Sequence, residues 1–350
     1  MILHLFANDK FVKDFIDKIN QLFGENNHEF IIFPAESKYF KRGDIVYSNV
    51  SFADLSNIRK ELKQKFKSVD RVIIHGFFMG VKDNIYIYHY LKKYSIKLIW
   101  CVWGADLYNQ YDYNHTFKNI LKIKPIINEY YRKKIIKSMY MIISGCDDEE
   151  VIKRYNTNAR QLGAHYTYHL IDSKEIECHE MINVMVGHSA TDTCRHIDTF
   201  ELLKPYIGKI KVYCPLSYPD DSVYIDKVCS AGRKIFGDDF VPMLDFIQYD
   251  EYVRFLNRMD IGVFNNNRQQ GNGNITNMLY LGKKVYLSKD NTIRKFYIGT
   301  ECLIFDTDDI RDGTFTTLLS EKQRKLNKDF IEREYSDETF YENWNRIFTE

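Results

Sequence analysis

Short runs of β-branched and aromatic residues alternate along the first half of the chain with longer stretches in which apolar residues recur at helical spacing. The helical patterns include Phe11–Phe23, Leu55–Phe66 and a long stretch from about Thr116 to Lys137. The apolar runs between them are Ile2–Phe6, Glu29–Phe33, Arg71–His75, Leu98–Val102 and Met141–Ile143. Because strands that alternate with helices form parallel sheets covered on both faces, this half predicts a doubly wound α/β domain.

The same alternation begins again after a polar, charged stretch at Asp172–Glu180, which we interpret as a linker. The candidate strands of the second half are Ile182–Val186, Lys209–Tyr213, Phe240–Pro242, Ile261–Phe264, Lys284–Leu287 and Cys302–Phe305. Aromatic residues then recur in a helical pattern up to Phe348. We therefore predict an N-terminal domain at 1–172, a C-terminal domain at 181–329, and a helical segment at 330–350 that packs back on the body of the protein.

The composition fits two domains in a reducing compartment. The 350 residues and a hydrophobic content of 45% are ample for two packed cores. A net charge of +1 without a basic tail gives no reason to expect a nucleic-acid partner. The seven cysteines are scattered without paired metal-ligand spacing, and no apolar run approaches the roughly 20 residues that span a bilayer. We expect a protein of a reducing compartment that is soluble or attached only at a membrane surface.

The loops that follow strands are the first candidates for a site, because ligands bind beyond the carboxyl ends of strands in open parallel sheets. One such loop follows Ile182–Val186 and carries Gly187, His188, Ser189 and Thr191. Its backbone N–H groups and hydroxyls suit phosphate oxygens. The same residue types cap helices whatever the function, so this loop taken alone leaves both interpretations open.

A second loop follows Ile261–Phe264 and leads into a predicted helix at Ile275–Leu281. Its glycines let backbone approach a ligand, the helix N-terminus favours an anion, and a guanidinium suits a pyrophosphate. Asn and Gly are also common turn residues, but a turn gives no reason for an arginine and two glutamines. We therefore predict an anion site formed by Arg268, Gln269, Gln270, Gly271, Asn272, Gly273, Asn274 and Thr276.

Two strand ends in the first domain carry candidate catalytic groups. Asp106 follows the run Leu98–Val102 and could take a proton from an attacking hydroxyl, although an isolated aspartate there more commonly caps a helix. His75 ends the run Arg71–His75 and could act as a second base or pair with phosphate, although a lone histidine at a strand end is more often a hydrogen-bonded core residue. Both interpretations stay open for each residue.

The stretch before Lys137 is basic and aromatic, and a helix of this kind can rest on anionic lipid headgroups. A solvated helix face is the alternative, because charge clusters are common on exposed helices. The basic residues of this candidate membrane surface are Lys118, Lys122, Arg132, Lys133, Lys134 and Lys137.

Four blocks of the sequence resemble glycosyltransferase family 56, the 4-acetamido-4,6-dideoxygalactose transferases that complete the lipid-linked repeat of enterobacterial common antigen. The blocks are Trp103–Tyr108, Val186–Ser189 with His196 beyond it, Cys214–Pro219 and Arg268–Gly273. The resemblance implies a GT-B fold, in which two Rossmann-like domains face each other across a cleft and the second binds the donor nucleotide. It also implies a dTDP-sugar donor, no cofactor or metal, and an acceptor glycan on undecaprenyl diphosphate at the cytoplasmic face of the inner membrane.

The resemblance further implies donor contacts at His196 and Tyr218, besides the two phosphate loops. In the GT-B layout Tyr213–Tyr218 and Phe246–Tyr249 are candidates for base and ribose contacts, with apolar packing as the alternative for Phe246. The family pattern is altered in the first loop, which leaves the donor sugar open. The altered positions are His188, Ala190, Thr191 and Cys194.

The resulting hypothesis is transfer of a 4-amino-4,6-dideoxy- or other deoxyhexose in the synthesis of an O-antigen or common-antigen type of surface polysaccharide. Arg268, Ser189 and the start of the following helix would neutralise the charge that develops on the departing diphosphate. Two other functions fit the same elements: a sugar-nucleotide epimerase and a non-catalytic nucleotide-sugar binder. The sequence does not decide whether the transfer inverts or retains the anomeric configuration.

Overall fold

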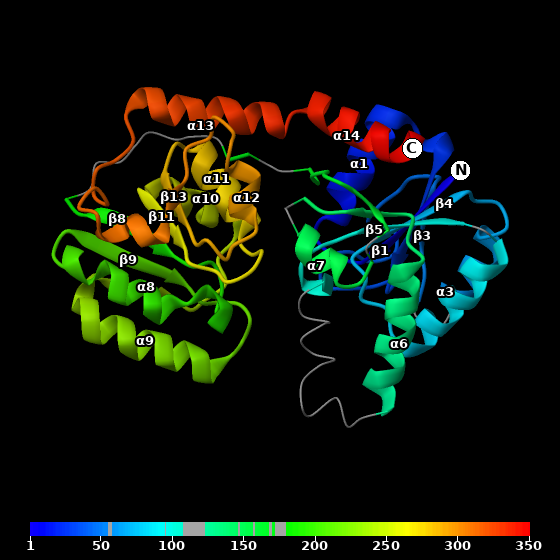
Figure 1. The fold of residues 1–350 in the computed structure, drawn as a ribbon, viewed down its shortest axis with the longest axis horizontal. Coiled ribbons are helices and arrows are strands. Elements are labelled where there is room, and N and C mark those ends of the chain that lie inside the picture. Colours follow the sequence, from blue (N-terminus) through cyan, green and yellow to red (C-terminus); the bar gives the residue numbers. More distant parts are fainter. Residues whose placement is uncertain are drawn as a thin grey trace. The chain divides into compact units, whose positions relative to one another are not determined.

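The fold is that of a computed structural model, which describes residues 1–54, 58–94, 96–107, 123–145, 148–156, 158–167, 170–171 and 180–350 (Figure 1). The chain divides into two compact units. The first is Met1–Thr167 together with Asp337–Glu350, and the second is Tyr168–Ser336. The predicted linker at Asp172–Glu180 lies outside the described residues except for Glu180.

The first unit contains a parallel sheet of seven strands in the order β3-β2-β1-β4-β5-β6-β7. The strands are β1 (Ile2–Ala7), β2 (His28–Phe33), β3 (Val50–Phe52), β4 (Arg71–His75), β5 (Lys97–Cys101), β6 (Met141–Ile143) and β7 (Arg160–Leu162). Our sequence prediction missed the two outermost strands. Each has only three residues, so it shows little periodicity of its own and is defined by pairing with its neighbour.

Helices cover both faces of this sheet because successive strand side chains point to opposite faces. Leu3 and Leu5 face a core shared with α2 (Ile58–Lys65), α3 (Val81–Tyr94), α6 (Ile123–Lys137) and α7 (Glu149–Lys153). The intervening Ile2 and Phe6 face a second core shared with α1 (Val12–Phe23) and α14 (Asp337–Thr349). The nearly continuous apolar run Ile2–Phe6 is typical of a strand in a sheet that is buried on both faces.

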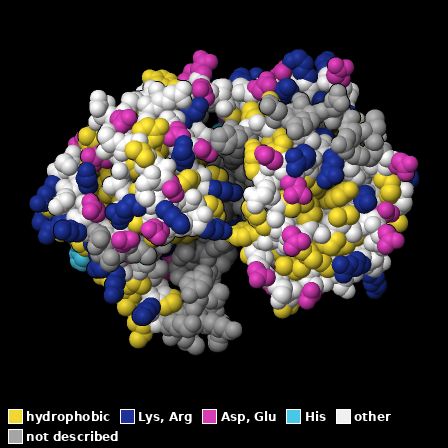
Figure 2. All heavy atoms as spheres, turned by 180° about the vertical axis from the view of Figure 1, so that it is seen from behind, with side chains coloured by type: hydrophobic (Ala, Val, Ile, Leu, Met, Phe, Trp, Pro, Cys, Tyr) yellow, Lys and Arg dark blue, Asp and Glu magenta, His cyan; other side chains and the backbone are white. Residues whose placement is uncertain are grey.

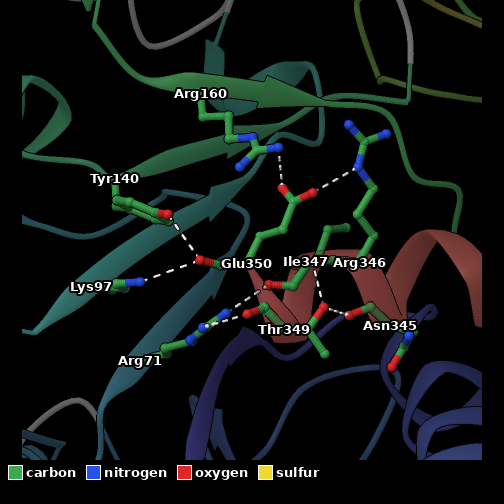
Figure 3. A network of polar contacts seen from close by, with 9 residues as sticks. All are labelled: Arg71, Lys97, Tyr140, Arg160, Asn345, Arg346, Ile347, Thr349 and Glu350. Carbon is green, nitrogen blue, oxygen red and sulfur yellow. Dashed lines mark hydrogen bonds and ion pairs between the residues drawn. The ribbon is translucent and has the colours of Figure 1, made fainter.

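The chain returns to the first unit through α14, whose last carbonyl groups are bound by side chains of successive sheet strands (Figure 3). Arg71 donates to the carbonyl oxygens of Ile347 (3.0 Å) and Thr349 (3.2 Å). The hydroxyl of Tyr140 donates to the carbonyl oxygen of Glu350 at 2.9 Å, and the Glu350 carboxylate pairs with Arg160 at 2.5 Å. These donors satisfy carbonyls that a helix C-terminus leaves without partners, and the positive charge of Arg71 suits the helix dipole.

The second unit contains a parallel sheet of six strands in the order β10-β9-β8-β11-β12-β13. The strands are β8 (Ile182–Val186), β9 (Ile210–Pro215), β10 (Phe240–Met243), β11 (Ile261–Phe264), β12 (Lys284–Leu287) and β13 (Phe305–Asp306). The helices are α8 (His196–Leu203), α9 (Ser222–Phe236), α10 (Tyr249–Arg258), α11 (Asn272–Tyr280), α12 (Ile293–Tyr297) and α13 (Glu321–Glu334). Helices α8 and α9 share one core with the sheet, and α11 packs on β11, β12 and α13.

The predicted C-terminal segment at 330–350 is not one helix. Helix α13 begins well before it, where Ser320 and Gln323 form a capping box, and ends at Glu334. After Tyr335 and Ser336, α14 begins at Asp337. Helix α13 belongs to the second unit and α14 to the first, so the predicted segment is divided between the two units.

Candidate functional site

The strand order of the second unit reverses between β8 and β11, because β9 and β10 lie on one side of this pair and β12 and β13 on the other. Such a reversal leaves a crevice at the carboxyl ends of the two central strands, and ligands of open α/β sheets bind there. The loops that follow β8 and β11 are the two loops predicted from the sequence to bind phosphate. The topology therefore places them at the same point of one sheet.

Side chains of these two loops form one hydrogen-bonded cluster. The hydroxyl of Thr193 donates to Oε1 of Gln270 at 2.7 Å, and the Gln270 amide lies 3.4 Å from Oγ1 of Thr191. The Ser189 hydroxyl lies 3.1 Å from Nε2 of His188 and 3.2 Å from Oγ1 of Thr191. The structure thus brings together four of the predicted site residues and joins them through Thr193.

Cys194 also belongs to this cluster. Its sulfur lies 3.3 Å from Oγ1 of Thr191 and 3.6 Å from Nδ1 of His188. Burial by itself raises the pKa of the Cys194 thiol, but the hydrogen bond and charge of His188, with the hydroxyls of Thr191 and Ser189, lower this pKa to about 6. The position that departs from the family pattern therefore places a thiol of lowered pKa beside a histidine within the loop.

Gly187 has a backbone conformation that only glycine adopts easily, with φ of +69°, and it packs against the ring of His196. A Cβ atom at this position would lie 2.4 Å from Nε2 of His196. His196 is fully buried, its Nδ1 lies 3.0 Å from the Tyr224 hydroxyl, and burial lowers its pKa to about 3. The predicted donor contact at His196 is therefore a neutral side chain behind the loop, which supports the backbone at Gly187.

The loop after β11 leads directly into α11. Gly271 is the N-cap residue in the left-handed conformation (φ 74°), and a Cβ atom there would lie 3.1 Å from Nδ1 of His188 in the other loop. The first turn of α11 contains Asn272, Gly273 and Asn274, so its backbone N–H groups begin at this junction. A helix N-terminus beside hydroxyls and an imidazole is a favourable environment for an anion.

The other predicted residues of this loop have different surroundings. Arg268 and Gln269 are half-buried. The Asn274 side chain accepts a hydrogen bond from the Tyr252 hydroxyl at 2.7 Å, and Thr276 is fully buried near Tyr297. Thr276 therefore belongs to the packing of α11.

Two aromatic side chains lie exposed at the ends of β9 and β10, as the GT-B layout suggested for base contacts. Tyr218 follows β9 and is 69% exposed, and Phe246 follows β10 and is 79% exposed. The packing alternative for Phe246 is therefore wrong. Exposed aromatic rings at strand ends offer a flat apolar surface on which a nucleotide base can stack.

In the first unit, Asp106 is fully buried and both of its oxygens accept hydrogen bonds. Oδ2 accepts from the backbone N–H of Phe77 (2.8 Å) and from Nε1 of Trp100 (2.7 Å), and Oδ1 accepts from the backbone N–H of Trp103 (2.9 Å). Burial raises the pKa of Asp106, and these hydrogen bonds and the charge of Arg132 partly offset it. This geometry favours a structural role, because the carboxylate is fully buried and already accepts three hydrogen bonds.

His75 is a fully buried member of a chain of side chains that crosses the interior beside the sheet. Nε2 of His75 lies 2.9 Å from Nδ1 of His4, and Nδ1 of His75 pairs with the Tyr166 hydroxyl. Nε2 of His4 in turn lies 3.0 Å from Nδ1 of His28. Nε1 of Trp103 donates to the same hydroxyl at 2.8 Å. Burial lowers the pKa values of His4 and His75 well below the ordinary range and that of His28 to about 4.

An indole N–H can only donate, so the Tyr166 hydroxyl accepts from Trp103, and each contact between neutral imidazoles in this chain shares a single hydrogen. His75 is accordingly engaged at both ring nitrogens. The sequence signal for the chain was His4, a histidine within the apolar run that opens the sequence.

The predicted membrane surface needs one correction. Arg132 is 1% exposed, and its guanidinium donates to the carbonyl oxygen of Asp106 at 2.8 Å, so it faces the core of the first unit. Lys118 and Lys122 lie outside the described residues. Lys133 lies 3.7 Å from Glu129, the ammonium of Lys134 lies over the ring of Tyr130, and Lys137 is exposed.

Helix α6 instead carries an exposed apolar stripe along its N-terminal half. The stripe residues are Ile123, Ile126, Ile127 and Tyr130, which recur at the spacing of one helix face. Figure 2 shows hydrophobic and basic side chains together on the surface over α6. No helix within the described ranges is long and apolar enough to cross a bilayer, and these ranges contain no group of three or more histidine, cysteine or acidic residues that could hold a metal.

The chain is similar in fold to solved glycosyltransferases over nearly its whole length. A glycosyltransferase from Rickettsia africae superposes with a TM-score of 0.71 at 10% identity, covering 99% of this chain and 97% of the other. Anabaena HepE, solved in complex with UDP and glucose, gives 0.65 at 8% identity, covering 99% of both chains. Sucrose-phosphate synthase from Thermosynechococcus elongatus gives 0.64 at 9% identity, covering 99% and 98%.

The sequence profile of the family described as "4-alpha-L-fucosyltransferase glycosyl transferase group 56" matches residues 6–350. This match favours transfer over the epimerase and the non-catalytic binder. The two parallel sheets with helices on their faces agree with the fold of the similar structures. The chain therefore belongs to glycosyl transferase group 56, and it is a glycosyltransferase with the GT-B fold.

Proposed function

We propose that the protein transfers a deoxyhexose from a dTDP-sugar to a glycan carried on undecaprenyl diphosphate, at the cytoplasmic face of the bacterial inner membrane. The observation that carries the donor part is the junction of the two loops at the β8/β11 switch point. There the backbone N–H groups of α11 begin beside His188 and the hydroxyls of Ser189 and Thr191. A diphosphate needs several donors aimed at one place, and this junction supplies them.

In this mechanism the second unit stabilises the leaving group. Negative charge grows on the diphosphate as its bond to the anomeric carbon breaks, and donors fixed in place before the reaction lower that barrier. Arg268 adds a permanent positive charge from the same loop, and Tyr218 or Phe246 stacks on the base. Similar structures include HepE solved with UDP, so the choice between dTDP and other nucleotides needs a direct test.

The experiment measures dTDP release from a dTDP-sugar with a detergent-solubilised lipid-linked acceptor, comparing Arg268→Ala with the parent. We expect kcat to fall about 100- to 1,000-fold, as when one preorganised donor is removed from a developing oxyanion. Arg254→Ala, at an exposed arginine of α10, is the matched control and should keep full activity. Full turnover in Arg268→Ala would show that the loop does not hold the diphosphate.

Thermal unfolding with dTDP, UDP and GDP tests the nucleotide. A ligand that binds only the folded protein raises the midpoint by mass action, so dTDP should give the largest shift. A larger shift with UDP or GDP would contradict the dTDP assignment. An altered sugar nucleotide formed without any acceptor would point instead to an epimerase.

The apolar stripe of α6 supports a membrane-bound acceptor. Exposed isoleucines recur at helical spacing beside Lys124, Lys134 and Lys137, as in helices that lie on an anionic bilayer. Binding to vesicles of phosphatidylglycerol should weaken roughly 10- to 150-fold in Ile126→Ser, since burial of one isoleucine contributes about 1.5–3 kcal/mol. Ile207→Ser, at an equally exposed isoleucine of the second unit, is the control. Equal vesicle binding by both variants would exclude α6 as the membrane surface.

A further inference from the structure

The first unit has a topological switch point of its own, where the predicted residues His75 and Asp106 are both fully buried. The strand order reverses between β1 and β4, with β2 and β3 on one side and β5 to β7 on the other. The loops that leave these two strands contain Asn8–Phe11 and Gly76–Phe78. By the same rule that locates the donor site, the carboxyl ends of β1 and β4 mark a ligand site.

Asp9 is the acidic group at this point. Its side chain is half-buried, and its Oδ1 is shielded from solvent without a hydrogen-bond partner within the described ranges of the chain. Burial raises the pKa of Asp9, and the neighbouring backbone N–H groups and the charges of Lys10 and Lys38 partly offset it. Buried carboxylate oxygens are normally hydrogen-bonded, so this unmet acceptor at a strand end needs a reason.

Helix capping does not supply that reason. Helix α1 begins at Val12 after the N-cap residue Phe11, and the backbone N–H groups of Lys10 and Phe11 that interact with the Asp9 carboxylate leave its Oδ1 without a partner. The acid in its first turn is Asp14, not Asp9. The surrounding polar residue Asn8 is fully engaged, since its amide donates to the carbonyl oxygens of Pro34 and Phe40.

Aromatic rings adjoin one another at the same strand ends. Phe11 is 39% exposed and Phe78 is 40% exposed, and their ring centroids lie 5.9 and 6.2 Å from that of Trp103. Gly76 (φ +75°) allows this approach, because a Cβ atom there would lie 2.7 Å from the Trp103 ring. The hydrogen bond from Trp103 to Tyr166 fixes the central ring. Rings exposed in this way present flat apolar surfaces, which suit the C–H face of a sugar.

We propose that Asp9 and the rings of Phe11, Phe78 and Trp103 form the acceptor-sugar site, and that Asp9 is the base of the transfer reaction. The rings pack against the acceptor sugar, and the Asp9 carboxylate accepts the hydrogen bond of the attacking hydroxyl. This inference rests on the proposed function, because it assigns the acceptor half of the same reaction. It replaces Asp106 and His75, whose polar atoms are already engaged.

The proposed reaction is a single nucleophilic displacement at the anomeric carbon. The acceptor oxygen forms a bond to the anomeric carbon, the bond from that carbon to the diphosphate oxygen breaks, and the bonding pair leaves with the diphosphate. The hydroxyl proton passes to the Asp9 carboxylate. Attack opposite the leaving group inverts the anomeric configuration, so the reaction must be inverting.

The main test compares Asp9→Asn with the parent in transfer from a dTDP-sugar to a lipid-linked acceptor. We expect kcat to fall at least about 100-fold, the usual contribution of a general base, with the thermal shift caused by dTDP unchanged. Asp14→Asn, in the first turn of α1, is the matched control and should keep the parental kcat. A parental kcat in Asp9→Asn, or a retained anomeric configuration in the product, would overturn the role of Asp9.

The two proposals fail separately in this design. A parent whose unfolding midpoint does not shift with dTDP and that transfers no sugar contradicts the proposed function, whereas an active parent with an equally active Asp9→Asn contradicts only this inference.

A second variant tests the aromatic rings without changing the carboxylate. Phe78→Ala should raise the acceptor KM roughly 2- to 10-fold, while Tyr341→Ala, an exposed ring of α14, should leave it unchanged. An unchanged KM in Phe78→Ala would overturn the aromatic part of the site.

Discussion

Substitution of Gly187 by alanine tests whether close packing, and not only backbone conformation, shapes the loop after β8. Gly187 and Gly208 both belong to the second unit and both have positive φ values, +69° and +79°. A Cβ atom at Gly187 would lie 2.4 Å from Nε2 of the buried His196, whereas one at Gly208 would have no atom within 4 Å. Gly208→Ala therefore measures conformational strain alone, and Gly187→Ala measures strain together with steric overlap.

The expected free energies of unfolding follow from these two contributions. The left-handed conformation costs an alanine about 1–2 kcal/mol, and overlap with a packed side chain adds about 1–3 kcal/mol. Each kcal/mol lowers the unfolding midpoint by roughly 2–4 °C in a unit of this size. Gly187→Ala should therefore unfold several degrees below Gly208→Ala.

The assay is thermal unfolding of the parent and both variants, with and without dTDP. Gly187→Ala should also lose most of the shift caused by dTDP, because a displaced His196 moves the backbone that carries His188 and Ser189. Gly208→Ala should keep that shift. Equal midpoints for the two variants would refute the argument from close approach, even if both were less stable than the parent.

Three further outcomes follow from the first unit. The stability of this unit to urea should fall between pH 7 and pH 5. The reason is that His4, His28 and His75 have folded pKa values below the unfolded value near 6.5, so they must be deprotonated to fold. A folded pKa of about 4, as for His28, lowers the free energy of unfolding by about 2 kcal/mol at pH 5. An unchanged urea midpoint at pH 5 would contradict the neutral chain. Asp106→Asn should lower the free energy of unfolding by about 2–3 kcal/mol, because an amide N–H would face a buried donor, and differential scanning calorimetry would measure it. Arg71→Ala should increase hydrogen exchange at the end of α14, since two carbonyl groups lose their donors, and unaltered exchange would show that the remaining contacts suffice.

The order of strands and helices could be predicted from the sequence, because apolar periodicity is a local property of the chain. The runs that became β4, β6, β8, β11 and β12 were predicted within one residue. The positions of the loops that follow β8 and β11 were also predicted, since a loop that follows a strand and enters a helix needs no long-range information to be recognised. Strands such as β3 and β7 were missed, because three residues show no period and only a neighbouring strand defines them.

The tertiary structure decided which polar groups remain available for chemistry. Arg132 and Asp106 looked exposed or catalytic in the sequence, but packing turned them toward each other inside the first unit. Asp9 is one acid among many in the sequence, and only the strand order shows that it follows one of the two strands between which the order reverses. Burial and hydrogen bonding depend on residues far apart in the chain, so the sequence by itself determined the family and the fold, while the three-dimensional packing decided which polar groups are buried and which are already hydrogen-bonded.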